Sequence, residues 1–133
     1  MILVDSSVWI DYFNGIPTQE THRLNDLLGQ DVAATGDLIL VEVLQGFRND
    51  SDFRAAERAL AKLPSFDLLG RERTQRAAMR YRELRRTGIT IRNTVDVVIA
   101  SFCIDEGFPL LFSDRDFLPM VKFLGLKPVV YLH

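Results

Sequence analysis

The chain has 133 residues, which fits one folded domain and leaves no room for two independent hydrophobic cores. Hydrophobic residues make up 47% and charged residues 26%, with 8 Gly and 5 Pro, a composition that excludes disordered and fibrous chains. The net charge of −2 is unevenly distributed, because residues 71–92 carry eight arginines against two glutamates and leave −8 for the rest. We expect a single domain over residues 1–133.

The start of the chain and its cysteine content indicate a protein that is not exported. An acid, Asp5, ends the apolar run at residues 2–4, without the basic region and long apolar stretch of a secretory signal. The longest near-apolar runs, residues 38–44 and 95–104, are each interrupted by an acid and are shorter than the roughly 20 residues that span a bilayer. The single cysteine, Cys103, is a small core residue by its apolar neighbours. We expect a cytoplasmic protein with no membrane contact.

Apolar periodicity and turn residues divide the chain into strands and helices. The first half predicts a strand at 2–4, helices at 8–13 and 18–28, a strand at 32–34, and a helix at 50–62. Residues 38–47 are apolar nearly all round and fit a buried helix or a strand, and their length favours the helix. The second half predicts a strand at 66–69, helices at 71–86 and 95–105, and strands at 109–112 and 129–132. A serine hydroxyl at 6–7 should cap the first helix and Thr94 the helix that begins at 95, while Gly107 should end that helix.

Strands that alternate with helices predict an α/β fold, in which a parallel sheet is covered on both faces. Functional groups in such folds collect beyond the carboxyl ends of the strands. Asp5 and Asp114 each follow a predicted strand directly, so we expect both carboxylates at that edge of the sheet.

Two further acids lie in strongly apolar helices. Glu42 is surrounded by the apolar residues of 38–44, and Asp96 lies within a run of valines and isoleucine. An ionised carboxylate in such surroundings is costly unless a cation or hydrogen-bond donors meet it. Both acids therefore need a partner, although the position of Asp96 in the first helical turn also favours a negative charge.

A divalent cation is the simplest partner if these acids converge with Asp5 and Asp114. Mutual repulsion would otherwise raise their proton affinities. An all-oxygen set without nearby His or Cys suits a hard ion, Mg²⁺ or Mn²⁺ in preference to Zn²⁺. Such ions activate water and neutralise a phosphoryl group, so the pattern predicts phosphodiester hydrolysis.

These residues occur in an ordered pattern along the whole chain. The pattern consists of Val4-Asp5-Ser6-Ser7, Glu42, Asp96-Val97-Val98-Ile99-Ala100, and Leu110-Leu111-Phe112-Ser113-Asp114-Arg115-Asp116-Phe117 after Gly107. With it, the sequence resembles the PIN-domain ribonucleases, specifically the VapC-type toxins of bacterial and archaeal toxin–antitoxin pairs.

The resemblance implies a three-layer α/β/α fold and an endoribonuclease that cuts a structured RNA, such as transfer or ribosomal RNA. It implies a catalytic set of Asp5, Glu42, Asp96, Asp114 and Asp116, in which Asp5, Asp96 and Asp114 hold Mg²⁺ or Mn²⁺. It also implies a homodimer, inhibition by a VapB-type antitoxin, and a supporting role for the hydroxyl of Ser6. Ser113 stands where many relatives have Thr, which keeps the hydroxyl.

Each acid also has a simpler interpretation. Asp5 is also consistent with a helix cap alone, and Glu42 with a solvent-facing acid or the partner of a core arginine. Asp96 would suit a helix dipole, while Asp114 and Asp116 would suit a turn. Trp9, Tyr12, Phe13 and Phe47 are core residues on the simpler interpretation, or the floor of an antitoxin groove.

The arginines are the candidate substrate-binding residues. Arg73, Arg76 and Arg80 share a helix face that either contacts RNA phosphates or is simply solvated. Arg92 either holds a substrate phosphate or pairs with an acid. Ser6 is a further candidate for substrate contact.

Two other functions fit parts of the pattern. One is a catalytically silent PIN-like protein that binds another protein. The other is a phospho-accepting signalling domain, which would use a lysine near the acids. Lys127 precedes the last apolar run, at the wrong end of a strand for that role.

Overall fold

A parallel sheet forms the centre of the molecule. The computed structural model describes residues 1–129, and its sheet contains β1 (Ile2–Val4), β2 (Ala33–Gly36), β3 (Ser65–Phe66) and β4 (Leu110–Leu111) in the order β3-β2-β1-β4. β1 pairs with β2 through Ile2 and Ala33, and with β4 through Leu3 and Leu110. The carboxyl ends of β1 and β4 therefore lie side by side, as the predicted parallel sheet requires.

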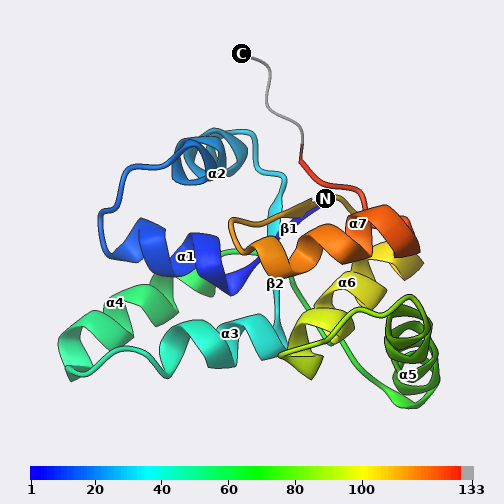
Figure 1. Ribbon diagram of the computed structural model, residues 1–133. Coiled ribbons are helices and arrows are strands. Elements are labelled where there is room, and N and C mark those ends of the chain that lie inside the picture. Colours follow the sequence, from blue (N-terminus) through cyan, green and yellow to red (C-terminus); the bar gives the residue numbers. More distant parts are fainter. Residues whose placement is uncertain (130–133) are drawn as a thin grey trace.

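Helices cover both faces of this sheet. They are α1 (Ser6–Phe13), α2 (Gln19–Gly29), α3 (Asp37–Leu44), α4 (Asp50–Leu60), α5 (Arg71–Arg86), α6 (Thr94–Glu106) and α7 (Leu118–Leu124), with the short 3-10 helix η1 (Arg115–Phe117) before α7. In Figure 1, α1 and α4 lie on one side of the strands, and α5 and α6 on the other. This arrangement confirms the predicted three-layer α/β/α class.

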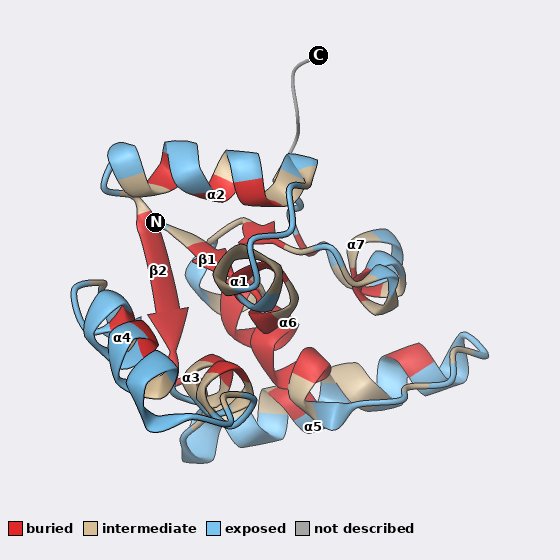
Figure 2. Cartoon of the chain, turned by 90° about the vertical axis from the view of Figure 1, so that its left-hand side faces the viewer, coloured by how far each residue is buried: buried red, intermediate tan, exposed pale blue. Residues whose placement is uncertain are grey.

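The core extends from the sheet into α6. Leu3, Val4 and Leu110 are fully buried, and every residue of α6 from 96 to 103 is buried as well. Figure 2 shows the same distribution, with buried residues along β2 and α6 and exposed residues on the outer faces of α2 and α4. A helix that is apolar all round is stable only when other elements enclose it, and here α5 and α7 do so. Among the described residues, no helix has the length and apolarity that crossing a membrane requires.

Two strand boundaries differ from prediction because distant segments supply hydrogen-bond partners to the backbone. The predicted strand at 66–69 ends at Phe66, since the amide of Leu68 donates to Oδ1 of Asp37, at 3.1 Å, and not to a strand. The second strand extends past its predicted end to Gly36, because Thr35 pairs with Ser65.

The predicted helix at 38–47 begins at Asp37 and ends at Leu44, whereas the helix at 71–86 matches its prediction at both ends. Gly107 ends α6 with φ of 71°, as predicted. Of the last predicted strand, at 129–132, only residue 129 falls within the described part of the chain. Its amide donates to the carbonyl of Leu110 at 3.1 Å.

Candidate acidic active site

Asp5 is the first residue after β1 and the cap of α1. Its amide donates to the carbonyl of Leu111 at 2.9 Å, which ties the ends of β1 and β4 together. Its Oδ2 accepts from the amide of Ser7, at 3.1 Å, and from the Ser7 hydroxyl, at 2.6 Å. The predicted hydroxyl cap is therefore wrong: the carboxylate caps the helix, because it reaches the second amide of the turn.

The other oxygen of Asp5 has a different environment. Oδ1 is buried and has no hydrogen-bond partner among the described residues. Burial raises the pKa of Asp5 to about 6, and the charge of Glu42 adds to this, although the bonds from Ser7 oppose it. A helix cap needs only one carboxylate oxygen, so capping alone leaves the buried Oδ1 unexplained.

Glu42 lies half-buried on α3, facing the start of α1. The hydroxyl of Ser6 donates to its Oε1 at 3.1 Å. Ser6 is itself buried, so this bond fixes one carboxylate oxygen against the beginning of α1. The resemblance implied a supporting role for Ser6, and this hydrogen bond agrees with it; contact between Ser6 and RNA stays a prediction.

Asp96 lies in the first turn of α6 and is 6% exposed. Burial, first, and then the charges of Asp5, Asp114, Glu42 and Asp116 together raise its pKa to about 7. Each of the other four acids that the sequence singled out is thus close enough to Asp96 for its charge to act on this carboxyl group. The cap of this helix is Asn93 and not the predicted Thr94, because the Asn93 side chain reaches the amide of Val95, at 3.0 Å.

The third group of acids follows β4. Asp114 caps η1, and its Oδ1 accepts from the amide of Asp116 at 2.9 Å. Carboxylate oxygens of Asp96, Asp114 and Asp116 all lie within 4.8 Å of one another. The turn interpretation accounts for the Asp114 cap, but not for the approach of three carboxylates from two segments.

A divalent cation fits this set of residues. The ligand atoms are all oxygens, which hard cations prefer. Asp5 supplies a buried Oδ1 without a partner, and Asp96 supplies a buried carboxylate beside Asp114 and Asp116. Positive charge at this position would relieve the repulsion that raises the pKa of Asp96.

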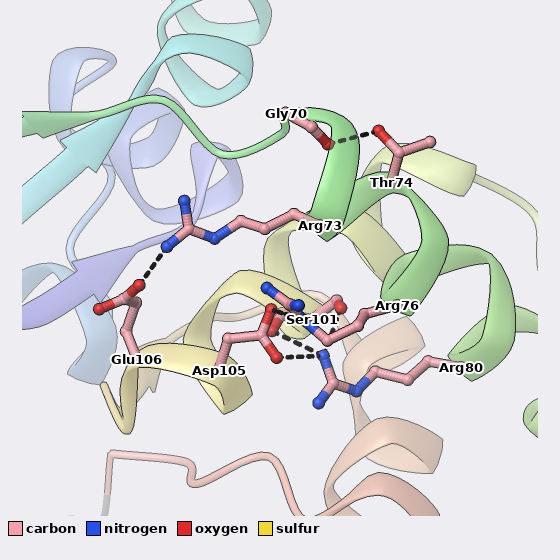
Figure 3. Close-up of polar contacts among 8 residues, drawn as sticks. All are labelled: Gly70, Arg73, Thr74, Arg76, Arg80, Ser101, Asp105 and Glu106. Carbon is pink, nitrogen blue, oxygen red and sulfur yellow. Dashed lines mark hydrogen bonds and ion pairs between the residues drawn. The ribbon is translucent and has the colours of Figure 1, made fainter.

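The three arginines of the predicted helix face contact acids of α6. Figure 3 shows Arg76 and Arg80 converging on Asp105, at 3.0 and 2.8 Å. Arg80 also donates to the hydroxyl of Ser101 at 2.6 Å, and Arg73 pairs with Glu106. These contacts give the arginines a structural role, so RNA contact by Arg73, Arg76 and Arg80 stays a prediction.

Arg92 and Arg115 lie closer to the acids. Both are exposed, and both line a cavity of about 80 Å³ that also includes Asp96, Asp116 and Asn93. Neither forms an ion pair within the described part of the chain. Contact between Arg92 and a substrate phosphate stays a prediction, whereas its alternative role, pairing with an acid, is not observed among the described residues.

Sequence reasoning missed Ser7 and Arg115. The position of Ser7, two residues after an acid that ends a strand, is the position where a capping carboxylate finds its donors, and that spacing could have identified it. Arg115 carries no signal in the sequence, because its place beside Asp96 and Asp116 is known only from the cavity that the three residues line.

The aromatic residues of α1 form a packed cluster. Trp9 is 2% exposed and stacks on Phe13 with ring centroids 5.9 Å apart, while Phe13 meets Phe47 edge-on at 5.8 Å. Tyr12 contacts both α1 rings. Trp9 is therefore a core residue, and the other three rings extend the core to the surface.

Two other chemistries are disfavoured: phospho-acceptance assisted by Lys127 and nucleophilic attack by the Cys103 thiol. The carbonyl of Lys127 accepts from the amide of Leu110, which is the first residue of β4, so Lys127 lies at the end of the strand away from the acids. Burial raises the pKa of the Cys103 thiol well above its usual value, which disfavours a nucleophilic thiolate.

The fold and the acidic cluster together define the class of this protein. The chain belongs to the PIN domain family, whose family profile matches residues 2–122. Within that family it belongs among the VapC ribonucleases: it is 31% identical over 129 residues to VapC ribonuclease Mb1587 of Mycobacterium bovis and to ribonuclease VapC11 of Mycobacterium tuberculosis, over 96% of this chain and 96% of each relative. The predicted family is thereby confirmed.

Solved structures share the fold. One is VapBC2 of Rickettsia felis bound to a DNA fragment from its promoter, with a TM-score of 0.78, 20% identity, and coverage of 97% of this chain and 98% of that chain. Another is VapC20 of Mycobacterium tuberculosis, a toxin that cleaves the sarcin-ricin loop, with a TM-score of 0.66, 19% identity, and coverage of 96% and 100%.

Proposed function

We propose that this chain is the toxin of a VapBC-type toxin–antitoxin pair, an endoribonuclease that uses Mg²⁺ or Mn²⁺ to cut a structured RNA, such as transfer or ribosomal RNA. The observation that carries the proposal is the meeting of carboxylates at one edge of the sheet, where a buried oxygen of Asp5 has no partner among the described residues. The VapC relatives and the sarcin-ricin loop specificity of one structural neighbour support RNA as the substrate.

Each acid has a distinct part in the proposed reaction. Asp5, Asp96 and Asp114 hold the cation, which when bound would make water more nucleophilic at neutral pH and offset charge on the phosphoryl group. Glu42, fixed through Oε1 by Ser6, accepts a proton from the attacking water at its other oxygen. Asp116, whose amide is bound to Asp114, completes the negative cluster.

Substrate binding in this proposal depends on positive side chains outside the cluster. Arg92 lines the same cavity as Asp96 and Asp116, which supports a role in holding a phosphate near the bond that is cut. Arg73, Arg76 and Arg80 are held by acids of α6 and would contact RNA with the part of each guanidinium that remains exposed.

We also propose a VapB-type antitoxin as the partner, a homodimeric state, a cytoplasmic location and a single domain over residues 1–133. The antitoxin is supported by the VapBC complex among the structural neighbours.

The test is cleavage of total cellular RNA by purified protein with Mg²⁺, Mn²⁺ or a chelator, followed by end-mapping of the fragments. Wild type should give discrete fragments only with metal, and Asp5→Asn should give none while remaining folded. Asp11→Asn, the same change elsewhere on α1, is the matched control and should cut like wild type. If Asp5→Asn cuts RNA normally, the metal mechanism is wrong. If wild-type protein that is folded and free of inhibitor cuts no RNA, the better-supported function is that of a catalytically silent protein that binds another protein.

A further inference from the structure

A basic hollow lies between α5 and α7, separate from the acidic cluster. It measures about 300 Å³, and α5 and α7 contact each other beside it. Its lining consists of Arg76, Met79, Arg80, Arg82, Glu83, Arg86 and Leu124. Four arginines therefore face one glutamate, with Asp105 behind Arg76 and Arg80 as a further negative charge.

Two of these arginines are fixed in place. Asp105 accepts from Arg76 and Arg80, and the Ser101 hydroxyl accepts from Arg80 as well (Figure 3). The side chains of Arg76 and Arg80 nevertheless remain 43% and 22% exposed. One carboxylate that holds two guanidinium groups leaves a net positive charge at a defined position.

The other two arginines are exposed and weakly engaged. Arg82 and Arg86 lie four residues apart, so their side chains share one face of α5. Within the described residues, Arg86 has one ion pair, to Glu83 at 3.9 Å with both side chains more than half exposed, and Arg82 has none. An exposed ion pair of this kind contributes little to stability, so a phosphate can replace Glu83 at little cost.

The hollow is connected to the acids along α7. The cavity at Arg92 and Arg115 lies where α7 begins, and Leu124 at the hollow is its last residue. At 1.5 Å per residue, α7 spans roughly 9 Å from residue 118 to residue 124. Positive side chains thus lie at both ends of a path that a nucleic acid strand can follow away from the cluster.

RNA needs such a site because the cluster itself repels phosphates. Electrostatic contacts with phosphates supply most of the sequence-independent affinity for nucleic acids. The net charge of −2 means that this attraction has to come from a local surface. Given the proposed activity on RNA, we propose that the hollow between α5 and α7 binds the sugar–phosphate backbone of the substrate, at a distance from the bond that is cut, mainly through Arg82 and Arg86.

The test measures binding of bulk transfer RNA as a function of salt. The protein is the full chain with Asp5→Asn, which prevents cutting, compared with the same chain carrying Arg82→Gln and Arg86→Gln. Gln keeps most of the side-chain length and helix propensity. Arg54→Gln with Arg58→Gln is the matched control, because these arginines are also exposed and four residues apart, on α4.

Loss of two phosphate contacts should make the slope of log K against log salt shallower by about 1.4 to 1.8. The gain in affinity when salt falls from 1 M to 0.1 M should then be about 25- to 60-fold smaller than for the chain with both arginines. The α4 control should keep the original slope. The inference is overturned if the α5 variant keeps its slope, if both variants lose the same amount, or if poly-glutamate binds the hollow as tightly as RNA. Because cleavage by the protein with Asp5 intact is measured separately, each of these outcomes can occur while the proposed nuclease function holds.

Discussion

Removing the carboxylate of Asp5 should stabilise the metal-free protein. Asp5 is 2% exposed, and its Oδ1 has no partner among the described residues. In Asp5→Asn, the amide oxygen can still accept from Ser7 and cap α1, since Asn caps helices as well as Asp does. The new NH₂ group can donate to neighbouring carboxylates, and the buried charge is gone.

The size and sign of this effect follow from the pKa. Burial raises the pKa of Asp5 from 3.8 to about 6, and each unit corresponds to about 1.4 kcal/mol, so ionisation in the folded state costs about 3 kcal/mol. Between these two values the folded protein retains a proton that the unfolded chain has lost, so stability falls as pH rises. The advantage of Asp5→Asn should therefore be near zero at pH 4 and reach about 3 kcal/mol at pH 7 and above.

Urea unfolding of wild type and variant at pH 4 and pH 8, with chelator, measures this difference. Saturating Mn²⁺ should stabilise wild type at pH 8 and narrow the gap, because an ion that binds only the folded state shifts the equilibrium towards it. If the variant is less stable than wild type at pH 8, or if the difference in stability does not change with pH, ionised Asp5 does not destabilise the metal-free protein.

Three further predictions concern neighbouring positions. Gly36→Ala would place a Cβ atom 2.6 Å from the Leu68 side chain, so thermal unfolding should show a loss of about 1 to 3 kcal/mol. In Asp105→Asn, the loss of charged hydrogen bonds should cost about 1.5 to 3 kcal/mol near pH 7. Burial opposes ionisation of Asp105, but bonds from two arginines outweigh it and lower its pKa, so the deficit should shrink in urea titrations as pH falls below 3.8. Glu42→Gln should keep its bond to Ser6 and its fold, yet lower kcat for RNA cleavage by about 10² to 10⁴-fold in single-turnover assays.

The sequence predicted the order of strands and helices and the acids that need a partner because both depend on local patterns. The apolar run before Asp5 and the Gly after α6 act within a few residues, so their effects could be inferred from the residues alone. Glu42 and Asp96 were identifiable because an acid inside an apolar helix needs a partner.

Most features that the sequence did not predict depend on contacts between segments that are distant in the sequence. The bond from Leu68 to Asp37 shortens β3, and the pairs between α5 and Asp105 occupy arginines that the sequence left available for RNA. Choosing Thr94 over Asn93 as the cap of α6 was a local error of one residue, because both types cap helices well.

The strand order has a consequence for protein synthesis. β1 is made first, but its neighbour on one side, β4, lies more than a hundred residues later, and the pair Leu3–Leu110 cannot form until then. Contacts this distant in sequence form late in folding. The acids after β4 join the cluster at the same moment, so a nascent chain that has not yet reached residue 114 holds an incomplete site. On the proposed function, a nuclease that could damage the translation machinery stays inactive until the segment after β4 has been made and has paired with β1.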